Sequence, residues 1–248
     1  MIIDSHAHYF KSFASMQGLS PAEFVEGFQA LGVDKAVIVT LEGFYGNYQA
    51  CNDELAAVAS QYPGVIQAWG TVNPRDGEKA IAEIGRCVDE LGMTGFKFHN
   101  WLQAVSAVDP CMFPVMEELA RRRLPVIFHD GTPPYASTDQ IAYLAGRYPD
   151  TPVLLAHSGL NEFARQALRG AVKHDNLFLG VCGARYELLK RAVQIVGPGR
   201  ILWGTDFPFG GKGNIIYHRA KVDALPISDD DKEKIFSGNI VRLVPSLG

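Results

Sequence analysis

Short apolar runs alternate with longer amphipathic stretches along the whole chain, and this alternation constrains the fold more than any other feature. The pattern is typical of repeated strand–helix units, in which the strands of one sheet run parallel. A closed (β/α)8 barrel requires eight strands and usually about 250 residues. The sequence therefore predicts one α/β domain, a TIM barrel over residues 1–248. We expect its strands at residues 1–4, 35–40, 65–71, 95–99, 125–129, 152–157, 177–181 and 200–205.

The stretches between these strands carry start and stop signals for helices. The segment Ser20-Pro21-Ala22-Glu23 has the residues of a capping box, with proline at the first helical position. Another helix is expected over residues 137–147, because a serine start precedes apolar residues at helical spacing. The polar-started segment 228–243 would complete the outer ring of helices.

Charge and hydropathy exclude several classes of protein. The net charge is -4, and the run Arg121-Arg122-Arg123 lies at the end of an expected helix, where cations complement the helix dipole, so a nucleic-acid partner is disfavoured. No segment approaches the roughly 18 apolar residues of a membrane span, and the first residues lack the features of a signal peptide. We expect a cytoplasmic protein with a small-molecule substrate and no nucleic-acid or membrane partner, and we leave a homodimer open.

The cysteines are too widely spaced to organise the fold. Cys51, Cys87, Cys111 and Cys182 form no CxxC pair, so we expect them to be reduced and mostly buried. On this interpretation, any metal would be bound by histidine and aspartate.

Five of the seven histidines fall at the carboxyl ends of expected strands, which open onto one face of a barrel. The first two form the motif His6-Ala7-His8, and residues two apart in an extended strand point to the same side. Neutral imidazoles that converge in this way can bind a transition metal. The others in this group are His99, His129 and His157, and Asp206 follows the eighth strand. We expect His174 and His218 to face solvent.

In this order, the motifs resemble those of the amidohydrolase superfamily over the whole chain. The motifs are His6-x-His8, Gly95-Phe96-Lys97-Phe98-His99, His129, Ala156-His157-Ser158-Gly159 and Gly204-Thr205-Asp206-Phe207-Pro208. The closer similarity is to the amidohydrolase-related branch, which includes metal-dependent hydrolases, lactonases and decarboxylases of carboxylated aromatics. The resemblance implies that His6, His8, His129 and Asp206 bind one divalent metal, and that His157 is a catalytic residue beside it.

Three imidazoles and one carboxylate leave an open position for water on zinc, the metal that we expect here, with manganese as the alternative. The pKa of a zinc-bound water can fall to about 7, which supplies hydroxide at neutral pH. Asp206 could accept the proton of this water and pass it to the leaving group. His157 could orient the water or donate a hydrogen bond to a substrate oxygen. A structural alternative remains for Asp206, because Asp before Phe-Pro is also a good turn former.

Other residues are expected to contact the substrate. Lys97 and His99 share the lumen side of the fourth strand, and in some superfamily members a lysine of this strand is carboxylated and bridges two metals. We favour substrate contact or an electrostatic role for both. Trp101, Tyr135, Arg185 and Phe209 lie in loops after strands and should surround the mouth of the site, with Arg185 placed for a substrate carboxylate. The aromatic-rich segment 42–48 suits a lid or an oligomer contact.

Two reactions are compatible with this set of residues. The first is hydrolysis of a small, carboxylated ester, lactone or amide by a metal-activated water, which the short loops favour. The alternative is metal-dependent decarboxylation of a carboxylated aromatic or enoic acid. A phosphoesterase is disfavoured, because the fourth strand offers Lys97 and His99 and no glutamate. A non-catalytic metal-binding protein is disfavoured by the presence of His157 and Asp206.

Overall fold

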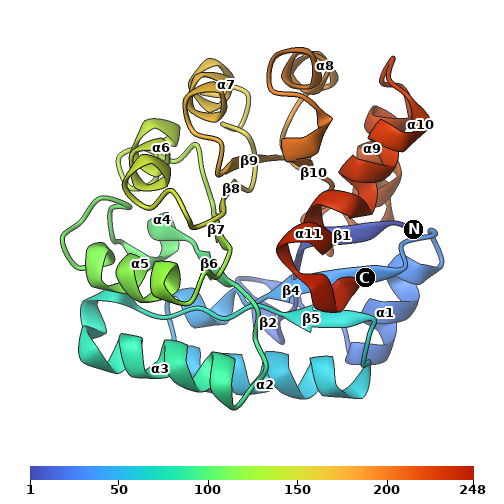
Figure 1. Cartoon of the computed structure of the whole chain (residues 1–248). Coiled ribbons are helices and arrows are strands. Elements are labelled where there is room, and N and C mark those ends of the chain that lie inside the picture. The colour runs from blue at the N-terminus through green and yellow to red at the C-terminus, as the bar shows by residue number, and fades with distance from the viewer.

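Eight parallel strands form the centre of the computed structural model, which describes residues 1–248, and helices surround them (Figure 1). In barrel order the strands are β1 (Ile3–His8), β4 (Lys35–Val39), β5 (Ile66–Ala68), β6 (Phe96–Phe98), β7 (Val126–Phe128), β8 (Val153–Leu155), β9 (Leu177–Gly180) and β10 (Ile201–Leu202). Two further short strands, β2 (Ser12–Phe13) and β3 (Met16–Gln17), form a hairpin after β1.

Backbone hydrogen bonds join the two parallel sheets into a closed barrel. Between β5 and β6, the Gly70 amide donates to the Gly95 carbonyl at 3.0 Å, and the Lys97 amide donates to Gly70 at 2.8 Å. Beside β10, the Ser5 amide donates to the Trp203 carbonyl at 3.0 Å, which connects the last strand to β1. The predicted TIM barrel is confirmed.

The first and last strands differ in length from their predictions. The strand β1 extends to His8, because its polar residues point into the open end of the barrel, where they replace apolar ones. The strand β10 ends at Leu202, since the chain turns away before Asp206, whose φ of 64° is left-handed.

A β-bulge in β1 aims the histidine pair. The pairing of β1 with β4 shifts its register between Asp4 and Ala7. Because one extra residue reverses the alternation of side chains, Ile3 packs inside the barrel whereas Ala7 packs outside it, although both have odd numbers. His6 and His8 therefore point into the lumen.

The helices form the outer ring (Figure 1). The eight longer ones are α1 (Pro21–Gln29), α2 (Tyr48–Gln61), α3 (Glu78–Asp89), α5 (Met112–Arg121), α6 (Thr138–Arg147), α7 (Ala164–Lys173), α8 (Tyr186–Ile195) and α9 (Gly211–Asp223), and the shorter ones are α4 (Asn100–Gln103), α10 (Asp229–Glu233) and α11 (Asn239–Leu243). The capping box expected at Ser20 is confirmed, and Ser137 starts α6 in the same way. None of these helices is long and apolar enough to cross a membrane.

Apolar side chains close the end of the barrel opposite the histidines. The side chains inside the ring of strands are Val37, Trp69, Ile127, Leu154, Phe178 and Leu202. Ile240, Val244 and Leu247 of the C-terminal segment pack against them. The Lys35 ammonium holds this segment by donating to the Leu247 carbonyl at 2.7 Å. Since this end is filled, the carboxyl ends of the strands form the one open mouth of the barrel.

Candidate metal centre and active site

The structure brings His6, His8 and Asp206 together at the mouth. The two Nε2 atoms are 3.1 Å apart, and Asp206 Oδ1 lies 3.0 Å from His8 Nε2 and 3.5 Å from His6 Nε2. Ligand atoms bound about 2.1 Å from one ion are separated by about 3.0 to 3.4 Å, depending on the coordination geometry. The spacing and chemistry of these donors therefore fit one divalent metal ion.

Asp4 connects the two segments that carry these donors. Its Oδ1 accepts hydrogen bonds from the His6 amide at 3.0 Å and the Thr205 amide at 3.1 Å, and its Oδ2 accepts from the Thr205 hydroxyl. The Asp206 amide donates to the His6 carbonyl at 2.8 Å. These bonds fix Asp206 beside the strand β1 in a left-handed conformation that nonglycine residues seldom adopt.

Burial and neighbouring charges give His6 and Asp206 the protonation states that a metal requires. Burial, reinforced by the Lys97 charge, holds the pKa of His6 well below its usual range, so its imidazole is neutral. Burial acts to raise the pKa of Asp206, but the hydrogen bond with His8 and the nearby imidazoles hold it well below its usual range. A neutral imidazole and an ionised carboxylate are the forms that bind divalent ions.

A second imidazole group lies beside this cluster. His157 Nε2 and His129 Nδ1 are 2.9 Å apart, and the His99 ring stacks on His129 with centroids separated by 3.8 Å. Burial lowers the pKa of His157 to about 4 and that of His99 to about 2, so both are neutral. The His157 ring is 5.3 Å from the His6 ring. His129 is not part of the group formed by His6, His8 and Asp206, and its role as the fourth ligand stays a prediction.

Lys97 is completely buried beneath the histidine pair. Its Nζ lies 3.0 Å from His6 Nε2, and burial lowers its pKa to about 8. The lumen-side position predicted for Lys97 is confirmed. A bridging role between two metals stays untested.

A cavity of about 380 Å³ opens above the cluster. His99, Trp101 and Phe209 line it as expected, and Phe209 covers His8 edge-on, with centroids separated by 5.7 Å. The full lining is His8, Phe13, Leu41, His99, Trp101, Leu102, His129, Thr132, Asp206 and Phe209. Tyr135 and Arg185, the other expected rim residues, do not line this cavity. Arg185 is the residue before α8 and extends into solvent.

Three features were missed by the sequence predictions. Cys182 lies beside His6 and His157 after β9, although the metal was expected to use only histidine and aspartate. Cys182 follows the carboxyl end of a strand, as the predicted ligands do. A search of all strand ends for metal-binding side chains would therefore have found it. Asp130 is fully buried and accepts a hydrogen bond from the His157 amide at 2.7 Å. His218, expected in solvent, is buried on α9.

A cluster of metal-binding side chains at the carboxyl ends of barrel strands places this chain among metal-dependent TIM-barrel proteins. The model of the amidohydrolase family named Amidohydro_2 matches residues 3–245. The chain therefore belongs to the amidohydrolase family, as its motifs predict.

Two relatives and one solved structure are similar to this chain. A 2-amino-3-carboxymuconate-6-semialdehyde decarboxylase of Dictyostelium discoideum is 24% identical over 241 residues, which are 79% of this chain and 66% of the relative. A 2-keto-4-carboxy-3-hexenedioate hydratase of Sphingobium is 23% identical over 244 residues, 80% of this chain and 71% of the relative. This chain thus spans about two thirds of the length of these relatives.

The solved structure is a dihydroxybenzoic acid decarboxylase of Polaromonas with bound manganese and the inhibitor 2-nitroresorcinol. Its TM-score is 0.78 at 18% identity, and the match covers 98% of this chain and 96% of that one. At this identity the likeness shows the fold that the two proteins share.

Proposed function

We propose that this protein is a metal-dependent carboxy-lyase that removes carbon dioxide from a small, planar, carboxylated substrate. Decarboxylases among its relatives support this alternative over the hydrolysis that the short loops favoured. The bound ion would be divalent, either manganese, as in the Polaromonas structure, or zinc, which imidazole donors suit.

The distribution of charge around the cavity carries this proposal. None of the 10 lining residues is lysine or arginine, and the walls include Phe13, Trp101 and Phe209. The buried cation Lys97 instead contacts His6, below the floor of the cavity. A substrate carboxylate would therefore bind at the reacting end, against the metal centre, while its planar body packs between apolar walls. A hydrolase for carboxylated esters would need a cation on the wall, away from the reacting carbonyl.

A metal ion held by His6, His8 and Asp206, with His129 as the expected fourth ligand, would act as a Lewis acid toward the substrate oxygens. The ionised Asp206 accepts the proton of a substrate hydroxyl and returns it to the ring carbon that bears the carboxylate. The bond to the carboxyl carbon then breaks, its electron pair stays on the ring, and carbon dioxide leaves. The phenolate that remains carries the charge of the original carboxylate.

His157 and the apolar walls assist this reaction but take no part in its proton or electron transfers. Neutral His157 lies with its Nε2 2.9 Å from Nδ1 of His129, the expected fourth ligand, and Asp130 holds the His157 backbone in place. Phe209 and Leu41 exclude water from the carboxylate. Loss of a neutral molecule is favoured where an anion is poorly hydrated.

The test offers the manganese-loaded protein a panel of hydroxybenzoates that carry a ¹³C-labelled carboxyl group next to the hydroxyl, and their methyl esters. The proposal expects labelled carbon dioxide from the acids and, in D2O, one deuterium at the vacated carbon. Methanol released from the esters without carbon dioxide from any acid would instead establish a hydrolase. Addition of water to an unsaturated acid in a parallel panel would identify a hydratase.

A further inference from the structure

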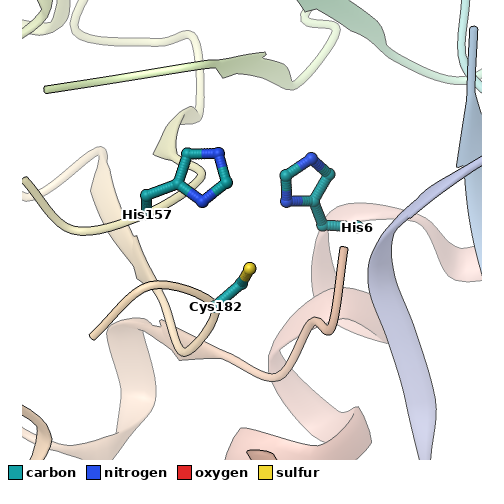
Figure 2. A group of neighbouring side chains, drawn as sticks. All are labelled: His6, His157 and Cys182. Carbon is teal, nitrogen blue, oxygen red and sulfur yellow. The ribbon is translucent and has the colours of Figure 1, made fainter. Parts of the chain in front are cut away.

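His6, His157 and Cys182 converge from three different strands of the barrel (Figure 2). His6 belongs to β1, whereas His157 and Cys182 follow β8 and β9. All three are buried, and one ligand atom of each lies within 4.8 Å of the other two. The proposed reaction does not use Cys182.

This group has donor atoms of its own. His6 Nε2 faces His8 and Lys97, and His157 Nε2 faces His129. The Nδ1 atoms therefore remain, and His6 Nδ1 is buried without any hydrogen-bond partner. Figure 2 shows that one nitrogen of each ring lies on the side of the Cys182 sulfur. A buried imidazole nitrogen without a hydrogen-bond partner lowers the stability of the fold, unless a ligand binds to it.

The loop after β9 is built to bring the sulfur to this position. Gly183 has a φ of 76°, and a Cβ added to it would lie 2.9 Å from the Cβ of His157. Only glycine allows the loop to approach so closely. The Lys221 ammonium fixes the same loop by donating to the carbonyls of Val181 at 2.9 Å and Ala184 at 2.6 Å.

We propose that His6, His157 and Cys182 form a second metal site that takes a thiophilic ion such as Zn²⁺ or Cd²⁺ and excludes Mn²⁺. One thiolate and two imidazoles suit d10 ions, whereas manganese prefers oxygen ligands. Around one zinc such donors would be separated by about 3.3 to 3.6 Å, so the group closes slightly on binding. The thiol of Cys182 and the ring N–H of His6 each lose a proton to water, because the bound cation stabilises both anions.

Occupation of this site has a functional consequence. His6 would bind both ions through its two nitrogens, and His157 would be drawn away from His129. Excess zinc would therefore inhibit the manganese-loaded enzyme. This consequence rests on the proposed function, whereas the binding of the ion does not.

Cadmium is the probe, because a cadmium–thiolate bond gives an ultraviolet charge-transfer absorption. Protein holding one equivalent of Mn²⁺ is titrated with Cd²⁺, and released Mn²⁺ is followed by its electron paramagnetic resonance signal. We expect the absorption to saturate at one added equivalent without release of Mn²⁺. It should be lost in Cys182→Ser. Cys87→Ser, at a buried thiol elsewhere, and the double variant Cys51→Ser/Cys111→Ser, at the half-buried ones, should retain it.

The outcomes are decisive in both directions. An absorption that persists in Cys182→Ser, or one that appears only as Mn²⁺ is released, would overturn a second site. If Cys182→Ser does not fold, X-ray absorption of the wild-type protein with one Mn²⁺ and one Zn²⁺ replaces it. One sulfur at about 2.3 Å from zinc supports the site, and a zinc shell without sulfur refutes it. These readouts are independent of turnover, so failure of the carboxy-lyase proposal leaves them interpretable.

Discussion

Replacing Asp4 tests whether hydrogen-bond geometry positions the metal ligands. Its carboxylate accepts from the amides of His6 and Thr205 through Oδ1 and from the Thr205 hydroxyl through Oδ2. In Asp4→Ala all three donors lose their acceptor. At about 1.5 kcal/mol for each of the three hydrogen bonds, the loss in unfolding free energy is about 4.5 kcal/mol. Metal ligands that lose the hydrogen bonds orienting them typically bind the metal about 10- to 100-fold more weakly.

Asp4→Asn should be mild by comparison. The asparagine Oδ1 can accept from both amides, and its Nδ2 can donate to the Thr205 hydroxyl after that hydroxyl rotates. Burial already raises the pKa of Asp4 to about 7, so a neutral group of this shape is tolerated there. We expect metal affinity within about threefold of wild type and a stability loss below about 1.5 kcal/mol, since all three contacts remain.

Unfolding in urea with EDTA and competition with a chromophoric chelator measure the two quantities. Asp34→Ala is the control, because Asp34 accepts a single exposed bond from the Ile2 amide and should change neither. Equal losses in Asp4→Asn and Asp4→Ala would refute the geometric argument and show that the charge of Asp4 is what matters.

Three further predictions concern positioning, the cavity wall and pH. Asp130→Ala removes the acceptor that holds the His157 backbone. It should lower kcat at least about 10-fold and leave the metal content unchanged. Loss of metal from this variant would contradict the prediction. Phe209→Ala should raise KM for the aromatic acid about 10-fold, because the substrate ring loses an apolar wall of the cavity. An unchanged KM would exclude Phe209 from the substrate pocket. Burial acts to raise the pKa of Glu83, but bonds from Arg86 and Asn52 hold it below 4.5. Its stabilisation is therefore present above pH 4.5 and lost as the pH falls through the folded-state pKa. Glu83→Gln should flatten the acid side of the stability curve in urea titrations, and an unaltered slope would refute this.

The barrel could be predicted because its signals are local. Alternation of short apolar runs with amphipathic stretches, and capping residues such as Ser20 and Ser137, depend on neighbours within a few positions. The predicted ligands were found because the carboxyl ends of parallel strands meet at one face. That rule brings His6, His8 and Asp206 to the same end of the barrel.

The missed features depend on contacts between distant segments. The bulge that aims His6 is held by Asp4 and Thr205, which are 201 positions apart. Cys182 approaches His157 only because the backbone at Gly183 adopts a positive φ. His218 and Lys221 on α9 are buried, although the polar sequence of this helix does not indicate a buried face. Local patterns therefore located the site, and tertiary contacts decided its details.

The central claim is that one divalent ion binds between β1 and the loop after β10. Anomalous diffraction at the manganese edge, from crystals of protein loaded with one equivalent of Mn²⁺, tests it most directly. We expect a single peak about 2.0 to 2.3 Å from the Nε2 atoms of His6 and His8 and from an Asp206 oxygen. A peak beside Cys182 instead, or a peak that does not contact Asp206, would contradict it.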